Sequence, residues 1–107
     1  MSLEVTNSAN MFYHADSFNQ NIGNWNVSAD TNMAYMFAAA SSFNQNIGNW
    51  NVSNVTTMEG MFEIPDEWVK LPPSNFNQNI GSWNVGKVLN MSKMFKSIRN
   101  LINPMQR

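Results

Sequence analysis

The hydrophobic and polar positions of this chain follow one pattern that returns along its whole length. The ten residues FNQNIGNWNV occupy positions 18–27 and 43–52 unchanged, and FNQNIGSWNV occupies positions 76–85. A Met-Phe pair marks the same pattern at residues 11–12, 36–37, 61–62 and 94–95, so the repeat lengths are 25, 25 and 33 residues. A fixed period of this size is typical of proteins in which successive repeats stack on one another.

The spacing of the hydrophobic residues changes within one repeat. Around Ile47, Trp50 and Val52 it suits a short extended segment, whereas Val55, Met58 and the Met-Phe pair recur at three and four residues, which predicts a helical or 3₁₀ turn. A unit this short cannot bury both stretches by itself, so equivalent residues of successive repeats should form ladders around one shared interior. The expected ladders are Phe18, Phe43 and Phe76; Ile22, Ile47 and Ile80; Trp25, Trp50 and Trp83; Val27, Val52 and Val85; and Met33, Met58 and Met91.

Asparagine recurs between the hydrophobic positions, at residues 19, 21 and 26 and at their equivalents in the next two repeats. A parallel stack places like side chains about 4.8 Å apart. Neutral amides tolerate that spacing, either by bonding to their copies or by satisfying the backbone of turns, whereas carboxylates would repel one another. Gly23, Gly48 and Gly81 are expected to mark a tight bend or a bulge.

The segments FNQNIGNWNVSNVTTMEGMF and MFAAASSFNQNIGNW resemble the repeats of the bacterial BspA-type leucine-rich-repeat surface proteins, which are also abundant among mycoplasma surface lipoproteins. The resemblance covers nearly the whole chain. It implies a repeat solenoid that is leucine-rich-repeat-like, a right-handed stack with a short parallel strand and a helical or 3₁₀ turn in each coil. It also implies a place on the cell surface or in the secreted fraction, and a role in adhesion or recognition.

The repeat divides the single expected domain, residues 1–107, into coils. These are a partial coil at 4–17, full coils at 18–42, 43–75 and 76–95, with an insertion at 63–75, and a C-terminal capping helix at 91–103. The helix is expected because hydrophobic residues from Met91 to Ile102 follow helical spacing and Pro104 stops the segment. No N-terminal cap is visible, so preceding repeats in a parent protein or self-association through the first coil are both expected.

The composition of the chain gives no support to several classes of function. The formal net charge is −1 and no cysteine is present, which gives no sign of nucleic-acid binding and leaves no disulfide or cysteine zinc site. The single His14 cannot anchor an ordinary metal site, and asparagine stands at positions where the resembling family often has aspartate, which argues against calcium. No cofactor and no enzymatic activity are expected. The chain has neither a hydrophobic run long enough to span a membrane nor a secretory signal at its start.

Two groups of residues are candidates for contact with a partner. Asp66, Glu67 and Trp68 lie in the insertion, where the Trp either anchors a partner or folds back over the neighbouring hydrophobic ladders. Basic residues gather near the C-terminus, and form either a solvated helix face or a patch for an anionic partner; the candidates there are Lys93, Lys96 and Arg99.

One position breaks the interior pattern. Asp30 stands where Val55 and Val88 stand in other coils, so its side chain is expected to be rearranged or turned to solvent.

The sequence therefore favours a non-enzymatic surface recognition or adhesion module, a fragment of a longer array, with an asparagine-rich face for a protein or polymeric ligand. The alternative is a structural spacer or stalk that has no ligand of its own.

Overall fold

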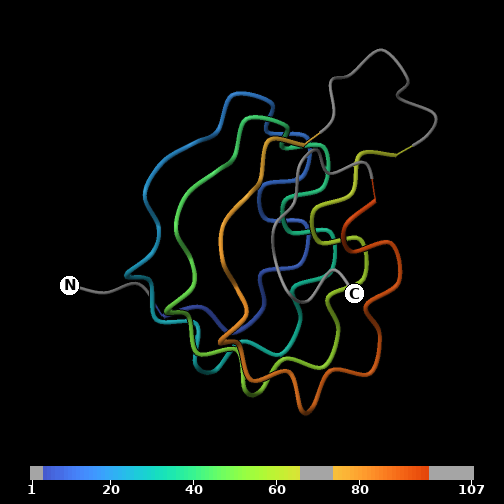
Figure 1. Ribbon diagram of the computed structural model, residues 1–107. Coiled ribbons are helices and arrows are strands. Elements are labelled where there is room, and N and C mark those ends of the chain that lie inside the picture. Colours follow the sequence, from blue (N-terminus) through green and yellow to red (C-terminus); the bar gives the residue numbers. More distant parts are fainter. Residues whose placement is uncertain (1–3, 66–73, 97–107) are drawn as a thin grey trace.

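A computed structural model describes residues 4–65 and 74–96 of the chain. Figure 1 shows the backbone passing round repeatedly, so that segments one repeat apart lie side by side. Within the described residues there is no α-helix, 3₁₀-helix or extended strand; turns alternate with isolated parallel bridges. These bridges join Glu4 to Asn26, Asn32 to Thr57, and Thr57 to Asn90. The local structure thus differs from the expected strand and helical turn in each coil.

Backbone hydrogen bonds connect each coil to the next at every second residue. Met33, Tyr35, Phe37 and Ala39 donate their N–H groups to the carbonyls of Thr57, Glu59, Met61 and Glu63, at 2.7–3.0 Å. The same series runs from residues 8–14 to 32–38, and from residues 58–64 to 90–96. In a helix these donors would be used within the segment. Here they are used between coils.

Residues with positive φ explain why the segment with helical spacing does not form a helix. Asn10, Tyr35, Gly60 and Lys93 are equivalent in the repeat and all have φ near +60°. A residue in the left-handed region interrupts a right-handed helical path, because L-residues do not form helices in that region. The spacing of three and four still buries Met33, Met36 and Met58, through consecutive tight turns instead.

The hydrophobic residues of successive coils share one interior. Phe37 stacks on two rings of the coil at 43–75. Its ring centre lies 4.1 Å from that of Phe43 and 5.6 Å from that of Phe62. Trp50 and Trp83 lie parallel, with ring centres 6.5 Å apart. Every expected ladder contributes residues to this core, although Phe18, Trp25 and Val85 are only partly buried. Met91 is exposed.

The tryptophan ladder also has a polar role. The indole N–H of Trp50 donates to the carbonyl of Ile22 at 3.0 Å, and that of Trp83 donates to the carbonyl of Ile47 at 3.0 Å. Both bonds are buried and both reach back to the preceding coil. Tryptophan therefore recurs because one side chain fills the interior and also gives the isoleucine carbonyl of the preceding coil, which already accepts a backbone N–H within its own turn, a second donor.

The three asparagine ladders use both of the expected bonding modes. Asn19 and Asn44 accept from the backbone N–H groups of Asn44 and Asn77, at 2.8 and 2.9 Å, and so link successive coils. The other two ladders close turns within a coil, as Asn46 does by accepting from the N–H of Gly48 at 2.9 Å. The side-chain oxygens of these asparagines therefore stabilise the backbone, both between coils and within turns.

The glycines that follow isoleucine are required by close packing between coils. A Cβ atom added to Gly23 would lie 2.6 Å from the carbonyl oxygen of Asn46, and one added to Gly48 would lie 2.7 Å from that of Asn79. Both glycines occupy turns, as a bend would predict. The obstacle to a side chain, however, is the backbone of the next coil, which cannot move without breaking the stack.

Asp30 is neither rearranged nor turned to solvent: it is fully buried. Its Oδ2 accepts from the hydroxyl of Ser8 at 2.6 Å, and its Oδ1 accepts from the N–H of Asn32 at 3.0 Å. Ser8 itself stands where later coils have Met33 and Met58. Two polar substitutions in neighbouring ladders therefore compensate one another, and burial raises the pKa of Asp30 while the two hydrogen bonds oppose that rise.

The expected insertion at 63–75 is described at its two ends. Glu63 and Ile64 keep the bonding of the repeat, since Ala39 donates to the carbonyl of Glu63 and Ile64 donates to that of Lys96. At the other end Asn75 donates to the carbonyl of Ser41 at 2.9 Å. Residues 66–73 lie outside the described part of the chain.

The expected capping helix at 91–103 is described only as far as residue 96, and residues 92–96 form turns. The rest of that segment lies outside the described residues.

Candidate functional site

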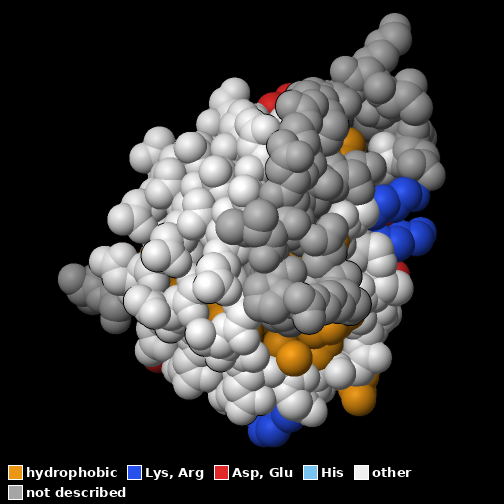
Figure 2. Space-filling view, viewed as in Figure 1, with side chains coloured by type: hydrophobic (Ala, Val, Ile, Leu, Met, Phe, Trp, Pro, Cys, Tyr) orange, Lys and Arg blue, Asp and Glu red, His pale blue; other side chains and the backbone are white. Residues whose placement is uncertain are grey.

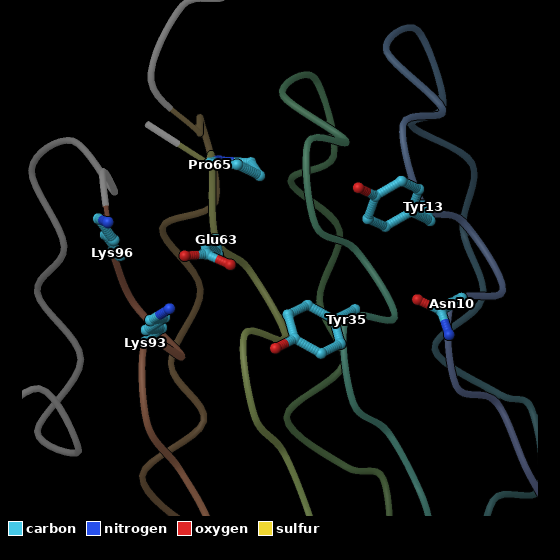
Figure 3. A pocket seen from close by; sticks show the side chains of 7 residues that line it. All are labelled: Asn10, Tyr13, Tyr35, Glu63, Pro65, Lys93 and Lys96. Atoms are coloured by element: carbon cyan, nitrogen blue, oxygen red, sulfur yellow. The ribbon is translucent and has the colours of Figure 1, made fainter. Parts of the chain in front are cut away.

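A groove of about 480 Å³ crosses the coils on the face formed by the positive-φ segments. Figure 3 shows its side chains coming from successive coils, with Asn10 and Tyr13 at one end, Tyr35 and Glu63 between, and the two lysines at the other end. The groove is lined by Asn10, Tyr13, Tyr35, Glu63, Pro65, Lys93 and Lys96.

Most of the lining belongs to two ladders, which we name the variable ladders. One contains Asn10, Tyr35, Gly60 and Lys93, and the other contains Tyr13, Ala38, Glu63 and Lys96. Each carries a different residue in every coil, whereas the phenylalanine, isoleucine and tryptophan ladders of the repeated decapeptide are identical in three coils. The scaffold thus repeats while the groove does not.

The first variable ladder holds residues in a backbone conformation that does not suit them. Tyr35 has φ of +57° and Lys93 has φ of +60°, whereas Gly60 adopts +59° at the same position without a steric cost. A left-handed non-glycine residue costs on the order of 1–2 kcal/mol. Positive φ also occurs at His14 and Ala39, which do not line the groove, so this conformation belongs to the repeated turn, and Tyr35 and Lys93 are accommodated in it.

Gly60 also shapes the groove directly. A Cβ atom at this position would overlap the Cδ1 and Cε1 atoms of the Tyr35 ring. The absence of a side chain on the third coil therefore lets the tyrosine of the second coil lie across it. The ring is half-buried in this position, with its hydroxyl directed toward the third and fourth coils in Figure 3.

The electrostatics of the groove change from one end to the other. Burial raises the pKa of the Tyr35 hydroxyl, and so do a hydrogen bond to the Glu59 carboxylate and the negative charges of Glu59 and Glu63. The phenol is therefore neutral at physiological pH; its proton is used in the bond to Glu59, and its oxygen can still accept a hydrogen bond. The side chain of Glu63 is only 6% exposed, while Lys93 is exposed. Figure 2 shows basic side chains gathered at one edge of a surface that is otherwise mostly uncharged.

Two of the expected site residues lie in the described part of the chain. Lys93 and Lys96 both line the groove. Asp66, Glu67, Trp68 and Arg99 lie outside the described residues. The sequence analysis missed Tyr13, Tyr35 and Glu63, although a signal was present: these residues occupy equivalent positions that differ between coils.

Other chemistry in the described residues is sparse. His14 Nε2 lies 3.3 Å from Asp16 Oδ1, and both side chains are about half exposed. Residues 4–65 and 74–96 contain no group of three His, Asp or Glu side chains close enough to hold a metal ion. In the same ranges, no helix has the length and hydrophobicity needed to cross a membrane.

The backbone ladders and the groove together define a chain of stacked repeats whose scaffold is uniform and whose groove-lining side chains differ from coil to coil. The chain belongs to the family described as "Mycoplasma protein of unknown function, DUF285", whose model matches residues 2–70 and again residues 70–107. Neither the curated proteins nor the solved structures contain a significant match to it.

Proposed function

We propose that this chain is a non-enzymatic recognition module of a surface-displayed, BspA-like leucine-rich-repeat solenoid, and that the groove is its binding site. The observation that carries the proposal is the contrast between the repeated scaffold and the variable ladders. The identity of these side chains is not set by the repeated packing, since a different residue occupies each equivalent position while the backbone bonding between coils stays the same.

The chemistry of the groove suits binding rather than support. It combines two tyrosine rings, an amide, a carboxylate and two ammonium groups within one concave surface. Convergent polar groups around a few aromatic rings are typical of ligand sites. A spacer or stalk, the alternative function, has no need of such a surface.

Cell binding by the isolated chain tests the proposal. The labelled chain is added to cultured epithelial cells and to their deposited matrix, and bound label is measured by flow cytometry and on coated plates. The groove variant Tyr35→Ala/Lys93→Ala should lose most of the binding. The matched control is Lys87→Ala/Leu89→Ala, which removes a lysine and a large side chain that are exposed outside the groove.

The two functions predict different outcomes. A recognition module binds at least one of the surfaces, and the control variant binds as the wild type does. Absence of binding to both surfaces, or equal binding by the groove and control variants, would favour the spacer and overturn the proposal. Circular dichroism and urea unfolding of each variant separate a lost site from a lost fold.

A further inference from the structure

We propose, resting on the function above, that the groove takes an oligosaccharide with a single carboxylate at one end and neutral sugars along the rest. Tyr35 packs against a neutral sugar ring, Glu63 faces sugar hydroxyls, and Lys93 pairs with the carboxylate.

The backbone around the groove argues against a strand-like peptide. Tyr35 donates its N–H to Glu59, Phe37 to Met61, and Gly60 to Ser92, at 2.8–2.9 Å. These donors are already used between coils, and the groove runs across the coils instead of along an open edge. Peptides that add a strand bind chiefly through free main-chain groups. Recognition here must therefore come from side chains.

The aromatic end of the groove suits the face of a sugar ring. The Tyr35 ring lies over Gly60, and Tyr13 on the neighbouring coil is 43% exposed. An aromatic face carries negative charge density and attracts weakly positive C–H groups. A pyranose presents such a face together with hydroxyls at its rim. Asn10 and the neutral Tyr35 hydroxyl can bond to those hydroxyls.

The charges fix the direction and the pattern of the ligand. Lys93 belongs to the coil two beyond that of Tyr35, a separation of about 10 Å at the usual spacing between parallel strands. Glu63 lies between them in Figure 3, and its carboxylate would repel an acidic group placed in the middle of the groove. A polymer with a negative charge on every unit therefore fits less well than one with a single acid at the lysine end.

NMR titration of the ¹⁵N-labelled chain tests this assignment. The probes are 3′-sialyllactose with lactose as its neutral partner, a hyaluronan tetrasaccharide in which acidic and neutral sugars alternate, and trigalacturonate, which is acidic at every unit. The amide signals of Tyr35, Gly60 and Lys93 should shift with 3′-sialyllactose, and the tetrasaccharide should bind more weakly because it carries a second acid away from the lysine end of the groove. Tighter binding of the tetrasaccharide would contradict a single terminal acid. Lactose and trigalacturonate should bind at least about tenfold more weakly.

Two variants assign the charges to residues. Lys93→Met keeps the length of the side chain and should weaken the acidic ligand about tenfold, whereas Lys87→Met, the same change outside the groove, should alter its affinity less than twofold. Glu63→Gln keeps the shape of the side chain and should reduce the discrimination against trigalacturonate. An unchanged amide spectrum away from each substitution shows that the fold is intact.

Several results would overturn the proposal. These are equal affinity for lactose and 3′-sialyllactose, tightest binding of trigalacturonate, shifts confined to residues outside the groove, or equal effects of the two lysine variants. If the acidic sugars do not bind while the groove variant still loses cell binding, the oligosaccharide assignment fails and the recognition function stands. If the acidic sugars do not bind and the groove variant binds cells as the wild type does, both the oligosaccharide assignment and the recognition function fail.

Discussion

The buried pair of Ser8 and Asp30 allows a quantitative test of how the coils are held together. The hydroxyl donates to the carboxylate over 2.6 Å, and both side chains are fully buried. Ser8→Ala removes the donor and leaves a carboxylate oxygen without that partner in the interior. This loss should lower the free energy of unfolding by about 2–3 kcal/mol, because a buried charged acceptor loses a bond that water cannot replace.

Removing the carboxylate should have a much smaller effect. Asp30→Val introduces the residue that occupies the equivalent positions 55 and 88, and it ends the cost of keeping a polar group in the interior. The double variant Ser8→Ala/Asp30→Val should therefore be about as stable as Asp30→Val alone. The coupling energy from this double-mutant cycle should therefore equal the cost of Ser8→Ala, about 2–3 kcal/mol.

Urea unfolding followed by tryptophan fluorescence measures these differences. The control is Ser53→Ala, which removes an exposed hydroxyl that also donates over 2.6 Å, to Asn51 Oδ1, and which should cost less than about 0.5 kcal/mol. Coupling near zero, or a loss for Ser8→Ala no larger than that of the control, would refute a buried compensating pair.

The pH dependence of stability gives an independent measure of Asp30. Burial raises its pKa in the folded chain above the ordinary value of 3.8, so at pH values between these two pKa values the folded state holds a proton that the unfolded state has released, and above both the carboxylate is charged in either state. The contribution of this group to stability is therefore fully present below pH 3.8 and is lost as pH rises through the folded pKa. The unfolding free energy of the wild type minus that of Asp30→Val should fall as pH rises from 3.8 to the pKa of Asp30 in the folded chain. A rise in this difference would contradict burial as the main influence on Asp30.

Three further substitutions probe the scaffold and the groove. Gly60→Ala should cost about 1 kcal/mol in unfolding free energy because φ is positive, and should also displace the Tyr35 ring and weaken ligand binding, which NMR titration measures. Gly48→Ala should cost about 1–3 kcal/mol in urea unfolding through its clash with the next coil, while Gly86→Ala, which meets no backbone atom of another coil, should cost less. Trp50→Phe should lose about 1 kcal/mol by removing the buried bond from the indole N–H to the Ile22 carbonyl, which keeps the backbone N–H of Trp25 as its other donor, and a cost no larger than that of an exposed substitution would contradict the role of the indole N–H.

Much of the scaffold could be predicted from the repeat, because packing between identical units imposes the same requirement at each equivalent position. The ladders of Phe43, Ile47 and Trp50 follow directly from their spacing and lie in the core. The segment around Met58 was predicted as a helical or 3₁₀ turn, and its hydrophobic spacing was read correctly. The backbone conformation of that segment differs from the prediction, because hydrophobic spacing indicates which residues are buried but not which carbonyls their N–H groups bond.

The site was less accessible to sequence reasoning. Lys93 and Lys96 were chosen because basic residues cluster near the C-terminus, and the groove does contain them. Tyr35 and Glu63 were overlooked because they are far from the lysines in sequence and belong to no motif. Their common feature is position within the repeat, which becomes a shared surface only when the coils are aligned.

The sequence by itself determined the period, the interior ladders and the amide ladders. Each follows from packing identical coils together, because equivalent positions then make the same contacts in every coil. Only the tertiary structure decided that Asp30 would be buried against Ser8, that Gly60 would leave space for the ring of Tyr35, and that tyrosine, glutamate and lysine from different coils would share one groove. These outcomes depend on which non-equivalent side chains face one another across the stack. A repeating pattern in one dimension does not contain that information, since it depends on the register and direction in which the coils meet.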